Sequence, residues 1–432
     1  MSKTKPAIIM MNIFNRKFRL INPMPLAERL FLFVIVSGMM LCLPNRVDAL
    51  GFRIPNQDAE ATGRGNAFTA TANNPSAIYY NPAGITQLEG LNAQVGFHII
   101  SVNSHYESAT TGKKSDTEFD VLPVPQAYYT YSPKESPLSY GLGIYVPYGL
   151  GLEWPEDTGF RTLAIRGQLN YTTINPVFAY QVCPSLSIAA GPTINYARLK
   201  LKQGILAPGD SFKFDGEDTA FGFNCGILWQ PFEKWSFGAN YRSETTMDFE
   251  GQADVQSVVP AAVPSGSKHS VASAPFAQFA MAGISFRPSE KWNIEVGVDW
   301  TDWDSLNTVT FKHTSLGDIN FPLNWESSFL YELGASRYFE NGYFLSAGYF
   351  YSQNSTSERS FNPIVPDTDL HVGSLGFGYK GEHWRWALSG QIIIGPTRTV
   401  DSSKSTSLVG QSANGKYHWF NQAVNVSVGY HF

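Results

Sequence analysis

The chain has 432 residues, of which 14% are aromatic and only 16% are charged, and its formal net charge is −5. The sequence contains no basic stripe, so a nucleic-acid partner is not expected. Cys183 and Cys225 are the cysteines beyond residue 49, which is too few for a disulfide framework. No apolar run of membrane-helix length follows residue 49, and this composition fits an outer-membrane β-barrel. A soluble two-domain β protein is the competing interpretation.

Residues 1–49 are predicted to be a secretory signal peptide with a long basic front. The apolar run Leu30–Leu43 spans 14 residues, which is short for a membrane helix and suits a signal core. Val47–Ala49 offers a cleavage site, and Met24 is an alternative start; an uncleaved N-terminal anchor helix is the other interpretation. Removal of this leader leaves 24 basic and 34 acidic residues, so the mature chain is predicted to be acidic.

The next stretch, Asp58–Gly90, is small and polar and has no sustained helical or strand period. It lies directly after the leader and directly before the first amphipathic segment. This position favours a plug over a linker. From Leu91 onward the sequence alternates between apolar and polar residues, with a period of two that is typical of strands. The alternation is cleanest in Phe420–Phe432, where apolar residues face one side and small or polar residues the other, as in a membrane strand.

Several motifs resemble the FadL-type transporters of hydrophobic compounds from the Gram-negative outer membrane. GRGNAF (Gly63–Phe68) and NNPSAIYYNPAG (Asn73–Gly84) look like the plug, or hatch, of that family. The resemblance extends over nearly the whole mature chain. Further matching stretches are GIYVPYGLGLEW (Gly143–Trp154), INPVFAYQV (Ile174–Val182), WSFGANYRS (Trp235–Ser243), VDWTDWDS (Val298–Ser305) and VPDTDLHVGSLGFGYK (Val365–Lys380).

The resemblance implies an all-β fold, a 14-stranded antiparallel transmembrane β-barrel at 91–432 with an N-terminal hatch at 50–90. Short turns and long loops alternate between the segments, as expected for an even-stranded barrel with both chain ends on the periplasmic side. A closed barrel has no free edge to pair, so a monomer is expected. The predicted strands are 91–103, 119–132, 138–147, 166–182, 185–201, 217–230, 235–250, 273–287, 292–303, 321–339, 343–353, 370–380, 383–395 and 419–432.

The resemblance also implies passive, cofactor-free uptake, with a ligand pocket at the start of the hatch and a lateral exit at a kink in the third strand. Phe52 matches the family's pocket-lining aromatic residue; an ordered remnant of signal processing is the alternative. Asn81, Pro82 and Ala83 would form a tight turn by the exit, or else an ordinary surface turn. Gly141, Gly143 and Pro147 would permit the kink, or the glycines simply face the lumen.

The predicted loop 147–166 is rich in apolar side chains, which are unusual on an exposed loop. They are explained either by capture of a hydrophobic ligand or by packing between loops. They include Leu150, Leu152, Trp154 and Phe160. Arg198 and Lys200 are the cations chosen to meet a ligand carboxylate, with solvated or lipopolysaccharide-facing charges as the alternative. The family's other basic pocket residue has no secure match, because Trp325 is followed by the acidic Glu326.

The expected function is therefore outer-membrane uptake of hydrophobic small molecules, with long-chain fatty acids as the expected ligands and aromatic hydrocarbons as the alternative. A general porin is a weaker alternative, because the Asp58–Gly90 segment favours a plugged barrel. An outer-membrane lipase is also weaker, since the eight histidines lack metal-ligand spacing and no G-x-S-x-G motif occurs. Neither a metal nor another cofactor is expected, and the chain is not expected to be an enzyme. Its other predicted partners are membrane lipid, lipopolysaccharide and, through the C-terminal Phe432, the barrel-assembly machinery.

Overall fold

The computed structural model describes residues 51–261, 263–403 and 409–432. The predicted signal peptide, residues 1–49, lies outside the described residues. Residues 51–432 belong to one compact unit. None of the helices within the described ranges is long and apolar enough to cross a membrane.

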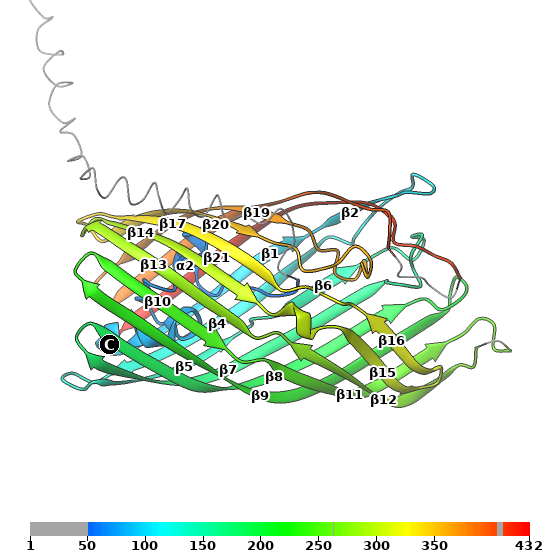
Figure 1. The fold of residues 1–432 in the computed structure, drawn as a ribbon, viewed down its shortest axis with the longest axis horizontal. Coiled ribbons are helices and arrows are strands. Elements are labelled where there is room, and N and C mark those ends of the chain that lie inside the picture. Colours follow the sequence, from blue (N-terminus) through cyan, green and yellow to red (C-terminus); the bar gives the residue numbers. More distant parts are fainter. Residues whose placement is uncertain (1–50, 262, 404–408) are drawn as a thin grey trace, which may run out of the picture. The chain divides into compact units, whose positions relative to one another are not determined.

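The strands form one antiparallel sheet that closes on itself, because β21 pairs with β1 and the other strands pair in chain order around the ring. In the described ranges, 21 strand segments make up 14 wall strands, seven of which are interrupted once. This 14-stranded barrel, drawn in Figure 1, confirms the predicted fold class. In chain order the wall strands are β1 (Gly90–Val102) with β2 (Ser104–Ser108), β3 (Lys114–Asp116) with β4 (Asp120–Ser132), β5 (Leu138–Tyr145) with β6 (Gly149–Glu153), β7 (Arg166–Cys183), β8 (Leu186–Gln203), β9 (Ser211–Phe232), β10 (Trp235–Arg242) with β11 (Thr245–Gln256), β12 (Gly266–Phe276) with β13 (Phe279–Ser289), β14 (Trp292–Thr301) with β15 (Thr308–Thr314), β16 (Gly317–Pro322) with β17 (Ser328–Tyr338), β18 (Tyr343–Ser352), β19 (Leu370–Lys380), β20 (Trp384–Val400) and β21 (Gly415–His431).

The connections differ between the two ends of the barrel. Tight turns such as those between β7 and β8 and between β19 and β20 lie at the end that holds the C-terminus, on the left of Figure 1. Long loops, such as the one from β18 to β19, lie at the opposite end, which is called the loop end below. This sorting is the one that the sequence predicted for an outer-membrane barrel.

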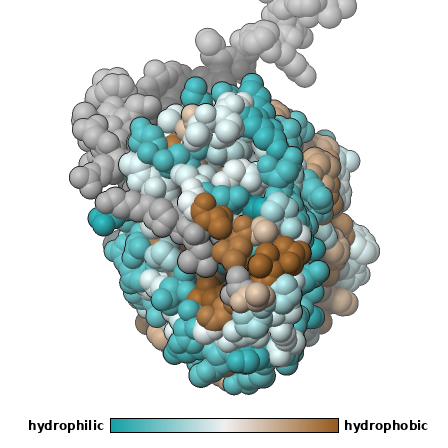
Figure 2. All heavy atoms as spheres, turned by 90° about the vertical axis from the view of Figure 1, so that its right-hand side faces the viewer, coloured by the Kyte–Doolittle hydropathy of each residue, from teal (hydrophilic) through white to brown (hydrophobic). Residues whose placement is uncertain are grey.

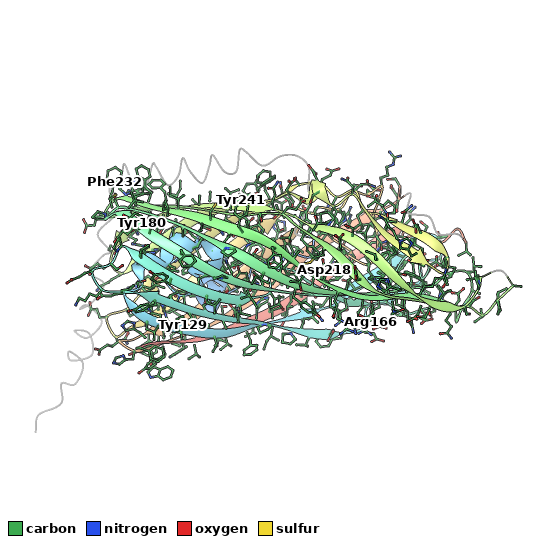
Figure 3. All side chains as sticks on the ribbon, turned by 90° about the horizontal axis from the view of Figure 1, so that it is seen from below. Tyr129, Arg166, Tyr180, Asp218, Phe232 and Tyr241 are labelled. Carbon is green, nitrogen blue, oxygen red and sulfur yellow. The ribbon has the colours of Figure 1, made fainter. Side chains whose placement is uncertain are left out.

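Side chains along each strand alternate between the outer face and the interior. In β21, Val424, Val426 and Val428 are exposed, whereas Asn425 and Ser427 are buried. Outward-facing aromatic side chains gather toward the tight-turn end, and outward-facing charges lie nearer the loop end. Figure 3 shows this with Tyr129, Tyr180 and Phe232 at one end and Arg166 farther along the barrel. Interfacial aromatic residues of this kind are common in membrane barrels.

Residues 51–89, called the N-terminal segment below, lie within the barrel and are almost entirely buried. They contain α2 (Ala59–Gly63), α3 (Ala77–Tyr80) and the 3₁₀ helix η1 (Pro82–Gln87). Inward-facing side chains from several wall strands hydrogen-bond to the segment. Examples are Tyr128 Oη to Gln57 O (3.0 Å), Ser236 Oγ to Ala70 O (2.6 Å) and Asn425 Nδ2 to Thr62 Oγ1 (3.1 Å).

Wall glycines allow the N-terminal segment to approach the strands closely. A Cβ atom on Gly348 would lie 2.0 Å from the backbone of Arg64, and one on Gly238 would lie 2.1 Å from the carbonyl oxygen of Thr69. Any side chain at these positions would therefore push the segment off the wall. This docking agrees with the hatch that the sequence predicts at 50–90.

Candidate functional site

The candidate site is an aromatic cage around Phe52, at the start of the N-terminal segment. The ring of Phe52 lies 4.8 Å from Trp303, 5.3 Å from Trp325, 5.7 Å from Phe276 and 6.0 Å from Tyr148, measured between ring centroids. These five side chains are called the Phe52 cage below. Edge-to-face and tilted contacts of this kind stabilise aromatic clusters beyond simple burial.

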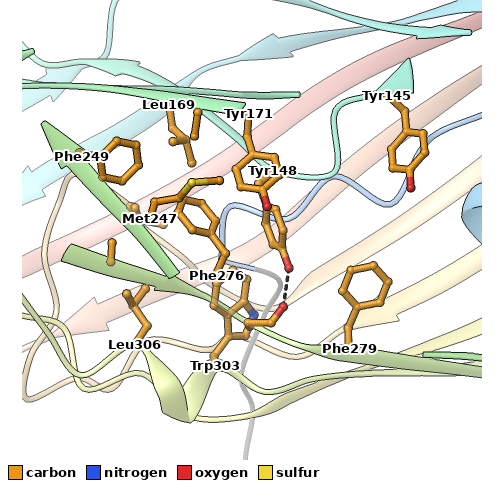
Figure 4. Close-up of a cluster of buried hydrophobic side chains, with 14 of the residues drawn as sticks. Tyr145, Tyr148, Leu169, Tyr171, Met247, Phe249, Phe276, Phe279, Trp303 and Leu306 are labelled. Atoms are coloured by element: carbon orange, nitrogen blue, oxygen red, sulfur yellow. Dashed lines mark hydrogen bonds between the residues drawn. The ribbon is translucent and has the colours of Figure 1, made fainter. Parts of the chain in front are cut away.

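The cage belongs to a larger apolar core inside the barrel. Figure 4 shows Tyr148, Tyr171 and Phe276 converging there, with the Tyr148 hydroxyl donating to the carbonyl oxygen of Ala277 at 2.6 Å. Trp303 and Tyr148 are buried, whereas Phe52 is only partly buried. The site is thus apolar and enclosed by aromatic side chains, which suits a hydrophobic ligand.

Three rings of the Phe52 cage, those of Tyr148, Trp303 and Trp325, come from interruptions in the wall strands. The third wall strand breaks between Tyr145, where β5 ends, and Gly149, where β6 begins. Pro147 lies in this break and has no backbone N–H, so it cannot donate to a ladder. The N-terminal segment pairs with the break instead: Ile54 N donates to Pro147 O at 2.8 Å, and Gly149 N donates to Phe52 O at 3.0 Å.

The same break opens a seam in the hydrogen-bond ladder between the second and third wall strands. Pairing of β4 with β5 ends at Ala127 and Ile144, and no ladder pairs β6 with β4 in the described residues. The side chain of Leu122 fills part of this seam, since a Cβ on Gly151 would lie 2.9 Å from it. This stretch, between residues 122–126 and 146–152, is called the β4–β6 seam below.

The predicted kink residues fall at different places. Pro147 lies in the break, whereas Gly141 and Gly143 lie in β5 where it pairs regularly with both β4 and β7. A Cβ on either glycine would lie 2.9 Å from the side chain of Ile78. These two glycines therefore make room for the N-terminal segment, and the break begins after them.

The turn Asn81–Ala83 contacts the wall at another strand. The Asn81 side chain accepts from Ala83 N at 3.2 Å and donates to the carbonyl oxygens of Thr69 and Ile227, each at 2.9 Å. Asn81 thus caps η1, with Pro82 at its first position, as expected of a tight turn. Its hydrogen bonds to the wall go to β9, not to the β4–β6 seam.

The predicted capture loop is divided between two clusters. Leu150 packs against the core that contains the Phe52 cage. Leu152, Trp154 and Phe160 belong to a second buried cluster with residues of neighbouring loop-end strands. The Trp154 Nε1 donates to Pro363 O at 2.9 Å. The burial of these three side chains is therefore explained by packing between loops, which was the alternative to ligand capture.

Arg198 and Lys200 lie on the outer face of β8, away from the Phe52 cage. Arg198 Nε is 2.8 Å from the carboxylate of Asp215 on β9, and Lys200 Nζ is 3.4 Å from it. Both side chains are more than 40% exposed. Arg198 and Lys200 therefore pair with a carboxylate of the wall and face outward. This placement agrees with the alternative of solvated or lipopolysaccharide-facing charges, not with a contact to the ligand carboxylate.

Asp367, in the loop between β18 and β19, ties the start of the N-terminal segment to the loop end. Its carboxylate accepts from Gly51 N at 3.1 Å and from the Ser355 backbone N and Oγ at 3.0 Å each. Complete burial raises the pKa of Asp367 from 3.8 to about 6, although these hydrogen bonds act in the opposite direction.

Asp367, Phe276, Trp303 and Trp325 were not predicted from the sequence as site residues. Trp303 and Trp325 were assigned to the predicted strands 292–303 and 321–339, whereas the structure places both in interruptions of the wall strands. Asp367 lies within a stretch quoted for the family resemblance, but no feature of the sequence linked it to Gly51. Contacts across more than 300 residues become visible only in the folded chain.

Two further apolar features lie outside the cage. Figure 2 shows hydrophobic side chains gathered at the centre of the loop end. On the outer face, a hollow of about 580 Å³ is lined by exposed side chains that include Ile188 and Ile227. The hydrophobic group lies at the loop end of the barrel, and the hollow lies on the outer face of the barrel wall.

Curated proteins with similar sequences come from Gram-negative bacteria. A putative outer membrane protein of Neisseria meningitidis serogroup B is 27% identical over 249 residues, and the match spans about half of each chain, 48% of this one and 52% of that one. The long-chain fatty acid transport protein of Salmonella typhi is 20% identical over 370 residues, covering 76% of this chain and 83% of that protein.

Solved structures show the same fold. A Pseudomonas aeruginosa FadL homologue superposes with a TM-score of 0.81 at 17% identity, covering 89% of this chain and all of the other. The Ralstonia pickettii toluene transporter TbuX gives a TM-score of 0.65 at 15% identity, covering 89% and 99%.

The closed 14-stranded barrel and its enclosed apolar site define an outer-membrane transport protein. Residues 40–386 match the family model described as outer membrane protein transport protein (OMPP1/FadL/TodX). The chain therefore belongs to this FadL/TodX family of outer-membrane transporters of hydrophobic compounds.

Proposed function

We propose that this protein is a passive channel that takes up long-chain fatty acids. The observation that carries the proposal is the Phe52 cage, an enclosed apolar site built by the N-terminal segment beside the β4–β6 seam. An acyl chain gains about 0.8 kcal/mol for each methylene that it buries in such a site. A water-filled porin offers no comparable contact.

The uptake route has three stages in this proposal. Apolar side chains at the loop end capture the ligand, and the Phe52 cage holds it. The β4–β6 seam then releases it sideways into the membrane. The seam supports the last stage because ladder hydrogen bonds are missing there, so a lateral passage breaks fewer backbone hydrogen bonds than elsewhere in the wall.

The N-terminal segment acts as the hatch in this proposal. The rings of the Phe52 cage already touch each other, so a ligand must displace one of them. Phe52 is the ring that yields, since it is only partly buried, whereas Trp303 and Tyr148 are buried. Its displacement opens the cage, and its return closes it.

An aromatic-hydrocarbon channel is the second candidate. A ring-lined cage suits a monoaromatic ligand as well as an acyl chain, and one structurally similar protein is a toluene transporter. The fatty-acid proposal is supported by a relative named as a long-chain fatty acid transport protein. The plugged interior speaks against a general porin, and nothing in the site suggests a lipase.

Uptake of labelled oleate and labelled toluene distinguishes these candidates. The chain is expressed in a Gram-negative host that lacks its own transporter of this family, and a host with an empty vector is the control. Oleate uptake well above the control supports the proposal. Toluene uptake without oleate uptake would favour the hydrocarbon channel, and leakage of small sugars alone would revive the porin.

A further inference from the structure

Arg242 is a buried guanidinium in the barrel wall whose polar neighbour is the neutral hydroxyl of Tyr145, not a carboxylate. It is the last residue of β10, it points inward and its exposed fraction is 4%. None of the described residues gives its Nε, Nη1 or Nη2 a hydrogen-bond partner. The neighbouring Tyr145 hydroxyl is directed to Asn175 Oδ1, at 2.8 Å.

Other buried arginines of the described chain are neutralised. Arg53 lies 2.5 Å from the carboxylate of Asp299, and Arg161 lies 3.0 Å from that of Asp210. Arg64 has Glu295 at 3.7 Å. No carboxylate of the described residues lies within 4.0 Å of the Arg242 guanidinium, so its positive charge stands without a counter-charge.

Three aromatic rings surround the Arg242 guanidinium instead. Its Cζ lies 5.2 Å from the ring centroid of Tyr145, 5.5 Å from Phe279 and 5.7 Å from Tyr79. Such cation–π contacts stabilise a guanidinium only in part. An enclosed cation with unused N–H donors therefore attracts an anion, because burial of an unpaired charge is costly.

The place of Arg242 links it to the uptake route. Tyr145 is the residue after which the third wall strand breaks. Tyr79 accepts a hydrogen bond from Arg53, which directly follows Phe52. The rings around Arg242 therefore adjoin both the residue that follows Phe52 and the residue that precedes the strand break at the β4–β6 seam.

We propose that Arg242 binds the carboxylate of an acidic hydrophobic ligand as it passes from the Phe52 cage toward the seam. The planar guanidinium offers two parallel N–H donors to a carboxylate, a geometry suited to this headgroup. A neutral hydrocarbon gains nothing from such a group. The inference rests on the proposed function, and it selects carboxylic acids over hydrocarbons as the ligand class.

Matched ligands and variants test this role. Equilibrium binding of oleate and of oleyl alcohol, which differ in the headgroup, is measured on the purified full chain in detergent at pH 8. The variants are Arg242→Met, which removes the charge, and Arg242→Lys, which keeps it. Arg198→Met is the control, because it removes an exposed arginine of the outer face. Heat-modifiable mobility on gels verifies that each barrel is folded.

The wild type is expected to bind oleate at least tenfold more tightly than oleyl alcohol. Arg242→Met is expected to lose this preference through weaker oleate binding alone, whereas Arg242→Lys retains part of it and Arg198→Met retains all of it. If Arg242→Met weakens the binding of oleate and of oleyl alcohol equally, Arg242 has only a structural role in the wall and the proposal is overturned.

Wild-type binding separates this inference from the proposed function. If the wild type binds both ligands equally, the carboxylate role of Arg242 is overturned, while a channel for hydrophobic compounds stands. If it binds neither ligand, the proposed function and the inference fall together. The wild-type comparison decides the question even if Arg242→Met does not fold.

Discussion

The Phe52 ring is expected to help anchor the start of the N-terminal segment, together with the Gly51–Asp367 hydrogen bond and the Arg53–Asp299 ion pair. Burying a Phe side chain is worth about 1.5–3 kcal/mol. Each favourable aromatic pair adds about 0.5–1.5 kcal/mol. Phe52 is partly buried and touches four rings, so Phe52→Ala should weaken docking of the segment by about 2–3 kcal/mol. This corresponds to roughly 30- to 150-fold more frequent release.

Amide hydrogen exchange followed by mass spectrometry measures this release directly. In Phe52→Ala, a peptide covering residues 51–58 should exchange roughly 30- to 150-fold faster, while peptides from β14 stay unchanged because the barrel ladder is independent of this ring. Phe361→Ala is the matched control, since Phe361 is buried in the second cluster. The reasoning is refuted if exchange at 51–58 is unchanged, or if Phe361→Ala accelerates it equally.

Three further expectations follow from the contacts of the site. Asp367 has a pKa of about 6 in the folded chain and returns toward 3.8 on unfolding, so acid favours the folded state through this group. Between pH 7.5 and 5 it should raise the free energy of unfolding by about 1.4 kcal/mol, measured as the difference between the wild type and Asp367→Asn in denaturant unfolding; an equal pH dependence in Asp367→Asn would contradict it. A disulfide between Leu122→Cys and Gly151→Cys should close the β4–β6 seam and stop oleate uptake until a reductant is added, with single-cysteine variants as controls; unimpaired uptake by the oxidised protein would remove the seam from the route. Neutral replacements of Arg198 and Lys200 should leave oleate binding within about twofold, because both side chains face outward; a tenfold loss would return them to the ligand site.

The barrel was predictable from sequence because its signals are local. Alternation of apolar and polar residues reports which face of a strand meets lipid, as in Val426 and Asn425. The predicted strand order and the sorting of short and long connections agree with the structure for the same reason. The interruptions within seven wall strands were not predicted, since short apolar loops carry no distinct period.

The site was predictable only in part. Phe52 and Pro147 were selected through the family resemblance, and the structure places both beside the wall break. Alternation alone could not decide the orientation of Arg198, because charged residues near a strand's outer end occur on either face. The role of Arg242 was hidden for a different reason: its significance is the lack of a carboxylate partner, which depends on every neighbour in the folded barrel.

Photo-crosslinking is the measurement that most directly tests whether the Phe52 cage holds the ligand. A fatty acid with a photoreactive group on its acyl chain is bound to the full chain in detergent, irradiated, and mapped by mass spectrometry. Labelling of Tyr148, Trp303 and Trp325 is expected, and excess oleate should suppress it. Labelling confined to the outer-face hollow near Trp300 and Phe329, with the cage unlabelled, would contradict the proposed site.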